Sequence, residues 1–367
     1  MQQPALVVTS IASPNAVLKS LADGTLARGM PFYLIGDVPS PSEFDLEGCS
    51  FYSLSAQRRT GLRTATVCPE RHYARKNVGY LLAMLGGSDV IVETDDDNAP
   101  RPGFWKQRER NHVVPVVKGK GWVNVYRWYT PELVWPRGFP LEHIQQAETS
   151  LHGIVPSETA SPIQQGLADG NPDVDAIYRL TRKLPLRFTS DIEVALGEGS
   201  WCPMNSQNTT WFAEAFALLY LPACCSFRMT DIWRSFVAQR VAWTNGWSVL
   251  FHGPTVDQDR NEHRLLGDFH DEIPGYLNTT RIRECLEAAP LRDGVGHITD
   301  NLLVCYERLI RQGVVGEAEL TMLNAWIDDY RECAAAIRPT FTAELLNLGT
   351  GISEHQKVVA PLTMERR

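Results

Sequence analysis

The chain has 367 residues, of which 44% are hydrophobic, and its formal net charge is -8. That length and composition are sufficient for one large or two modest domains with a sizeable core. Because binding to phosphate backbones needs clustered Lys and Arg, an acidic chain without a long basic run is not expected to bind nucleic acid.

The first hundred residues alternate strand and helix patterns. Apolar runs bounded by turn residues predict four buried strands, and helical spacing with Pro or Gly near the ends predicts two helices. The strands are expected at residues 5–10, 31–36, 50–54 and 89–93, and the helices at 14–27 and 71–85. This alternation indicates an α/β fold with a mostly parallel sheet flanked by helices, in which ligands bind beyond the carboxyl ends of the strands.

The rest of the chain is less regular at first and then mostly helical. Short strands and long loops are expected at 98–165, helices at 172–181, 211–221 and 231–244, and a strand at 247–252. From Arg281 onward the spacing is helical again, and the last residues show little periodicity. We therefore predict a main domain over 1–280, a helical C-terminal region over 281–350 and a mobile tail over 351–367.

The segments that mark cellular location are not evident in this chain. Its first residues lack a basic region followed by a long apolar stretch, so no signal peptide is expected. The longest apolar stretch, around 211–222, contains Glu214 and is too short to span a bilayer. The eight cysteines include no Cys-x-x-Cys pair, which predicts neither a zinc site nor a disulfide framework. These features are typical of a cytoplasmic protein or a soluble domain.

The strongest chemical signal is an apolar strand that runs directly into three carboxylates, Asp95, Asp96 and Asp97. Three like charges packed together are costly unless a cation or solvent neutralises them. Asp95 and Asp97 have the D-x-D spacing, which places two side chains on the same side of an extended segment. Mg²⁺ and Mn²⁺ bind through one or two such carboxylates plus substrate phosphates. The alternative is an exposed acidic turn without a ligand.

Several longer motifs carry a resemblance to a known family. They are the run from Arg75 to Tyr80 followed by the acidic triplet, Trp135-Pro-Arg-Gly-Phe-Pro-Leu, the segment from Ile163 to Ala176, Cys202-Pro-Met-Asn-Ser-Gln-Asn-Thr, and Phe227-Arg-Met-Thr-Asp-Ile-Trp. Together they resemble the plant reversibly glycosylated polypeptides, which are UDP-arabinopyranose mutases, and still more closely the STELLO glycosyltransferases. The resemblance covers roughly residues 5–280 and implies a GT-A-like, Rossmann-like fold that acts on a nucleotide-sugar.

The resemblance implies a donor site built from strand ends and a basic pair. Thr9, Ser10 and Asp37 match the strand ends that receive the nucleoside. Arg75 and Lys76 match a basic pair near the diphosphate, for which a solvated helix face is the alternative. Asp96 is assigned to the nucleotide-sugar.

Further roles follow from matching positions later in the chain. His252, at the end of the strand expected at 247–252, matches a late histidine that joins Asp95 and Asp97 as a metal ligand; a packed or capping histidine is the alternative. Asn205 and Asn208 match amides that face sugar hydroxyls, although amides in a loop can equally satisfy the backbone.

Two residues are assigned to the reaction itself. Asp231 matches an acid that faces the sugar and acceptor as a general base, whereas its place before a helix is also that of an ordinary N-cap. Arg137 matches an arginine that the mutases associate with self-glycosylation and mutase activity. The sequence that follows, Leu141-Glu142-His143, departs from the basic mutase pattern.

The resulting hypothesis is a glycosyltransferase that moves a sugar, with Mn²⁺ or Mg²⁺, from a UDP-sugar to a hydroxyl acceptor that is a glycan or a small molecule. The first rival is a mutase that interconverts ring forms of a UDP-sugar. The second rival is a non-catalytic partner protein with a GT-A shape. The sequence leaves open whether the protein forms a homo-oligomer.

Overall fold

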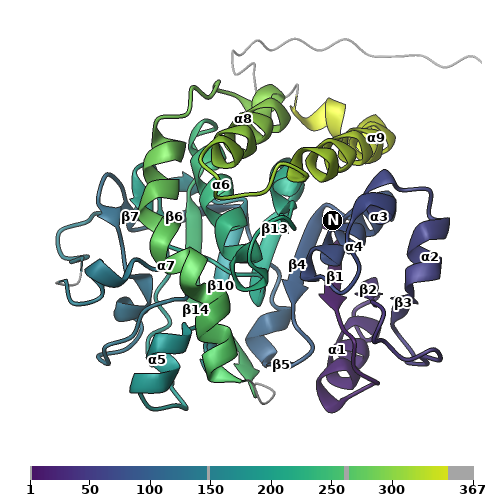
Figure 1. The fold of residues 1–367 in the computed structure, drawn as a ribbon, viewed down its shortest axis with the longest axis horizontal. Coiled ribbons are helices and arrows are strands. Elements are labelled where there is room, and N and C mark those ends of the chain that lie inside the picture. Colours follow the sequence, from purple (N-terminus) through teal and green to yellow (C-terminus); the bar gives the residue numbers. More distant parts are fainter. Residues whose placement is uncertain (1, 147–148, 260–263, 346–367) are drawn as a thin grey trace, which may run out of the picture.

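The computed structural model describes residues 2–146, 149–259 and 264–345. Its centre is a ten-stranded sheet in the order β3-β2-β1-β4-β13-β10-β14-β11-β7, with β5 paired to β14 (Figure 1). The strands of this sheet are β1 (Pro4–Thr9), β2 (Phe32–Ile35), β3 (Ser50–Tyr52), β4 (Val90–Thr94), β5 (Asn98–Pro100), β7 (Val116–Val117), β10 (Ile163–Gly170), β11 (Val194–Leu196), β13 (Asn208–Phe212) and β14 (Val249–Gln258). Two small sheets pair β6 (Asn111–Val114) with β9 (Ser157–Ala160) and β8 (Gly121–Trp122) with β12 (Ser200–Trp201).

The N-terminal half of the sheet is parallel and covered on both faces. β1 pairs in parallel with β2 and β4, and β2 pairs in parallel with β3. Leu6 and Val8 pack in a cluster with α1 (Ala16–Leu26), while Val7 points to the opposite face and packs in a cluster with α4 (Lys76–Leu85). This alternation follows from the period of two along a strand. The four strands and the first helix expected here are confirmed, and the second helix is confirmed from residue 76.

The C-terminal half of the sheet is mixed in direction. β13 runs antiparallel to both β4 and β10, whereas β10 and β14 are parallel. The helix expected over 211–221 is wrong at its start, because Trp211 and Phe212 belong to β13 and a 3₁₀ helix follows at Ala213–Leu219. These residues are almost all buried, and a continuous buried apolar run does not distinguish a strand from a helix.

Helices complete the layers around the sheet. Besides α1 and α4 they are α2 (Leu54–Arg59), α3 (Arg63–Val67), α5 (Ala176–Thr181), α6 (Thr230–Trp243), α7 (Leu265–Glu287), α8 (Ile298–Arg311) and α9 (Glu319–Leu345). α9 packs on α3 and α4, and it lies beside α8 in Figure 1. The expected α/β fold, with a mostly parallel sheet flanked by helices and a helical C-terminal region, is confirmed. Among the described residues, no helix is both long and apolar enough to cross a membrane.

The predicted domain division, the predicted tail and the predicted state of the cysteines can each be compared with the structure. The domain boundary placed at residue 280 lies inside α7, and the division itself stays a prediction. The tail predicted over 351–367 lies outside the described residues. All eight cysteines are free thiols, as expected from their scattered spacing.

A buried ion pair fixes β4 against the layer behind it. Glu93 and Arg234 are almost fully buried, and two nitrogens of the guanidinium lie 2.7 and 3.1 Å from the two carboxylate oxygens. Trp211 donates to the same carboxylate at 2.8 Å, and the hydroxyl of Tyr80 also donates to it. Separating the two partners would leave an uncompensated buried charge, which is costly. The network therefore fixes the positions of β4, β13, α4 and α6 relative to one another.

Candidate functional site

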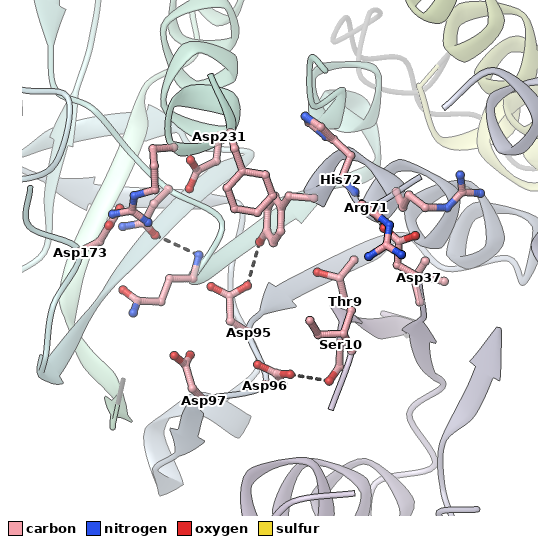
Figure 2. Close-up of a pocket in the computed structure, with 18 of the residues that line it drawn as sticks. Thr9, Ser10, Asp37, Arg71, His72, Asp95, Asp96, Asp97, Asp173 and Asp231 are labelled. Atoms are coloured by element: carbon pink, nitrogen blue, oxygen red, sulfur yellow. Dashed lines mark hydrogen bonds between the residues drawn. The ribbon is translucent and has the colours of Figure 1, made fainter. Parts of the chain in front are cut away.

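A cavity of about 470 Å³ opens at the carboxyl ends of β1, β2 and β4. Thr9 and Ser10 line it after β1, Asp37 lines it after β2, and the acidic triplet lines it after β4. Figure 2 shows Asp95, Asp96 and Asp97 along one side, with Asp173 and Asp231 on the side of the C-terminal half. Parallel sheets bind ligands at this edge, so the position agrees with the sequence prediction.

Most of the residues singled out from the sequence meet in this cavity. Those that line it are Thr9, Ser10, Asp37, Arg75, Asp95, Asp96, Asp97, Arg137, Asn205 and Asp231. Lys76, Asn208 and His252 are not among the lining residues.

The first two carboxylates of the triplet are each held by donors from another element. Asp95 Oδ1 accepts from the hydroxyl of Tyr73 at 2.8 Å and from Lys76 Nζ at 3.2 Å. Asp96 accepts a short hydrogen bond from the hydroxyl of Ser10. Burial raises the pKa of Asp95, and the ammonium of Lys76 opposes that shift; burial is also the main cause of the raised pKa of Asp96. Both raised values show that negative charge is costly here, and a cation would offset that cost.

The third carboxylate is contacted from the far half of the sheet. Asp97 Oδ2 accepts from Gln258 Nε2 at 3.2 Å, and Gln258 is the last residue of β14. Among the described residues, no group of three or more His, Cys, Asp or Glu side chains is arranged to hold a metal ion. The triplet nevertheless fits Mg²⁺ or Mn²⁺, because these ions take one or two carboxylates and complete their shell with phosphate oxygens and water.

His252 lies some distance back along β14. The strand continues to Gln258 with a register shift opposite Gly166 and Ala168, so it ends six residues later than the sequence predicted. His252 Nδ1 lies 2.8 Å from the carbonyl oxygen of Gly253. Burial, together with the positive charge of Arg108, lowers the pKa of His252 to about 3. The ring is therefore neutral, and its role as a metal ligand stays a prediction.

The predicted basic pair faces into the protein. Arg75 is almost fully buried, and its guanidinium donates to Gln57 Oε1, Cys68 O and Ala65 O at 2.7–3.1 Å. Lys76 is fully buried and donates to Thr94 O at 2.8 Å as well as to Asp95. Both side chains fix backbone around the cavity, and only Lys76 contacts the acidic triplet.

The two amides differ in their surroundings. Asn208 lies on β13, where its Nδ2 donates to Leu167 O and Thr255 Oγ1 at 2.8 and 2.9 Å. Asn205 lines the cavity, and its Oδ1 accepts from Gln207 N at 3.0 Å and from Gln165 Nε2 at 3.2 Å. Of the two, only Asn205 is placed to meet a ligand.

Arg137 is clamped between two carboxylates. Its guanidinium donates to Asp173 at 2.7 and 2.9 Å and to Asp231 at 2.9 and 3.1 Å, and it also donates to the carbonyl of Arg228. Burial by itself would raise the pKa of Asp231, but the charge and hydrogen bonds of Arg137, together with the charges of Arg234 and Arg228, outweigh burial and hold that pKa below its usual value. Asp173 is a lining residue that the sequence did not single out, although it lies in one of the family-like segments.

A second residue missed from the sequence is Arg71. It lines the cavity and is exposed, and its φ of 55° lies in the left-handed region that side chains with a Cβ seldom adopt. The carboxylate of Asp37 accepts from Val38 N at 2.7 Å and from His72 N at 2.8 Å, so it fixes the turn after Arg71. In Figure 2, Arg71 lies beside Asp37 and Thr9. No local sequence pattern marks this strained turn.

Comparison with known proteins identifies relatives of the chain. The family model of the STELLO glycosyltransferases matches residues 228–344. Two proteins of Arabidopsis thaliana, the probable glycosyltransferases STELLO2 and STELLO1, are each 30% identical over 344 residues, which cover 88% of this chain and 44% of each relative. The chain thus spans less than half the length of these curated relatives.

One solved structure matches much more weakly. A crystal structure of a mycobacterial protein aligns over 77% of this chain and 74% of that one, with a TM-score of 0.37 and 11% identity. Likeness at this level carries no inference about the site.

The backbone at Arg71 gives a stability prediction. A Cβ in the left-handed region costs about 1–2 kcal/mol, so Arg71→Gly should be more stable than Arg71→Ala by about 1 kcal/mol in urea unfolding. At Lys19, an exposed position inside α1, the order should be reversed, because Ala exceeds Gly by about 1 kcal/mol in helices. An Arg71→Ala variant at least as stable as Arg71→Gly would contradict the strained turn.

Proposed function

We propose that the chain is a member of the STELLO glycosyltransferase family, and that its GT-A-like domain transfers a sugar from a UDP-sugar to a hydroxyl acceptor with the help of Mn²⁺ or Mg²⁺. The observation that carries this proposal is the acidic triplet at the end of β4, which lines a cavity large enough for a nucleotide. Small-molecule sites are concave and pre-formed in this way.

The charge of the cavity supports a role for a divalent cation. Six carboxylates and five guanidiniums line it, a formal net charge of -1. The carboxylates are Asp37, Asp95, Asp96, Asp97, Asp173 and Asp231, and the guanidiniums are those of Arg71, Arg75, Arg137, Arg179 and Arg228. Beside the acidic triplet, the negative charge of a nucleoside diphosphate would be repelled unless a cation lay between them. A bound divalent cation neutralises phosphate oxygens and stabilises the diphosphate as a leaving group.

The residues of the chain divide this work between them. Asp95 and Asp97 would hold the cation on the side of the triplet, and Asp96 would stay fixed by Ser10. The nucleoside would lie against the ends of β1 and β2, where Thr9 and Asp37 line the cavity. Because Asp37 holds the turn at Arg71, the exposed guanidinium is the side chain best placed to reach this end of the donor.

The arrangement of Arg137 favours a transferase over a mutase. In the mutases that the sequence resembles, this arginine is associated with mutase activity. Here all three guanidinium nitrogens donate to Asp173, Asp231 or a carbonyl, so a sugar would have to displace one of these partners. We therefore assign Arg137 to the wall of the acceptor side.

The ion pair with Arg137 also affects whether Asp231 can act as a general base. General base catalysis is most efficient when the pKa of the base lies near the working pH, and the pKa of Asp231 is held below its usual value. The geometry therefore favours Asp231 as a residue that positions Arg137. The role of general base, predicted from the resemblance, is the alternative that experiment must separate from it.

Thermal unfolding tests the role of the cation. UDP with Mn²⁺ should raise the melting temperature, since ligand at 100 times its Kd stabilises by about 2.7 kcal/mol. Asp97→Asn should abolish this shift, whereas Asp45→Asn, an exposed acid outside the cavity, should retain it. A shift that needs no Mn²⁺ or survives in Asp97→Asn would reject the metal site, and a larger shift with GDP would reject uridine. A non-catalytic partner without a donor site predicts no shift.

Kinetics of variants test the role of Asp231. Asn keeps an oxygen that accepts from Arg137, so Asp231→Asn should lower turnover of the UDP-sugar less than about ten-fold and leave donor affinity within about ten-fold. Asp173→Asn, which alters the same clamp, should behave alike. A fall of roughly 10²–10⁴ in Asp231→Asn alone would instead identify a general base.

A further inference from the structure

A chain of hydrogen bonds joins the acidic triplet to the clamp of Arg137. Tyr73, in a 3₁₀ turn before α4, places its hydroxyl 2.8 Å from Asp95 Oδ1 and 2.6 Å from the hydroxyl of Ser206. The hydroxyl of Ser206 lies 3.3 Å from Asp231 Oδ2. Two hydroxyl groups therefore connect two carboxylates that lie on different sides of the cavity.

Counting hydrogens shows that this chain has two arrangements. Each hydroxyl carries one hydrogen, but the chain contains three oxygen–oxygen contacts. A phenol keeps its hydrogen at neutral pH, because its ordinary pKa is about 10. Because Tyr73 and Ser206 are only 2.6 Å apart, one hydrogen must lie between them. The remaining hydrogen is donated either to Asp95 or to Asp231, but not to both.

The distances indicate which arrangement the structure holds. The contact from Tyr73 to Asp95 is 2.8 Å, while the contact from Ser206 to Asp231 is 3.3 Å. The shorter contact is that of a well-formed hydrogen bond between oxygens, and the longer one is stretched. Asp95 thus holds the hydrogen of Tyr73, and Ser206 donates to Tyr73.

We propose that Tyr73 and Ser206 form a hydrogen-bond switch that couples cation binding at Asp95 to Asp231. The inference rests on the proposed function, in which Asp95 faces a divalent cation. When the carboxylate of Asp95 binds a cation, the hydroxyl of Tyr73 rotates and donates its hydrogen to Ser206. The hydroxyl of Ser206 then rotates and donates its hydrogen to Asp231. Each hydrogen stays on its own oxygen, so no covalent bond changes.

The consequence is an order of events in the cavity. An added donor on Asp231 fixes the position of that carboxylate, so the acceptor side becomes fixed once the donor side is loaded. Coupling of this kind is reciprocal, which means that a change at Asp231 must alter cation affinity at Asp95. Tyr73 and Ser206 are positioning residues, since they act through the two carboxylates.

A double-mutant cycle tests the switch without an acceptor. Binding of Mn²⁺ in the presence of UDP is measured by electron paramagnetic resonance of the free ion. Asp231→Asn should weaken Mn²⁺ binding by about three- to ten-fold, because the neutral amide attracts the hydrogen of Ser206 less and leaves that of Tyr73 on Asp95. In a Ser206→Ala background, which keeps the backbone N–H of residue 206 near Asp231, the same change should alter the affinity less than about two-fold.

Three further variants guard against a loss of structure. Tyr73→Phe keeps the ring and removes the hydroxyl, so Asp231→Asn should also be without effect in that background. Ser161→Ala and Tyr306→Phe remove buried hydroxyls outside the cavity and should leave the full effect of Asp231→Asn in place. Equal effects in all backgrounds would overturn the switch while the metal site stands. Absence of Mn²⁺ binding in the unaltered protein would overturn the proposed function as well.

Discussion

Three adjacent carboxylates at the end of a buried strand repel one another, and much of the surrounding structure serves to hold them in place. Donors come from four places: the turn before α4, the first residue of α4, the end of β1 and the end of β14. Behind the triplet, Glu93 of β4 is paired with Arg234 of α6, which fixes the strand itself. Carboxylates that are held close together in this way are suited to a ligand of opposite charge. A divalent cation, with a diphosphate bound to it, is such a ligand.

The site joins both halves of the chain. The acidic triplet lies before the segment that the STELLO family model matches, whereas Asp231 lies inside it. β13 inserts between β4 and β10 and so connects the parallel N-terminal half to the strands that follow. Ser206, just before β13, is placed by that strand between Tyr73 and Asp231. The fold therefore brings the donor side and the clamp of Arg137 to one cavity.

Local patterns in the sequence predicted the parts of this arrangement that depend on neighbouring residues. The first four strands and the acidic triplet follow from apolar runs that end in polar residues, so the carboxyl edge of the sheet was identified correctly. The length of β14 depends on pairing with β10 and β5, which no run of apolar residues reveals, and this is why Gln258 rather than His252 meets Asp97. The inward direction of Arg75 and the strained turn at Arg71 likewise depend on tertiary contacts.

The central claim is that the acidic triplet binds a divalent cation together with a nucleoside diphosphate. A crystal structure of the protein with UDP and Mn²⁺, with anomalous scattering recorded for manganese, tests it most directly. We expect an anomalous peak in contact with carboxylate oxygens of Asp95 or Asp97 and with the diphosphate, and uridine against Thr9 and Asp37. Bound UDP without a manganese peak at the triplet, or a peak held by other residues, would contradict it.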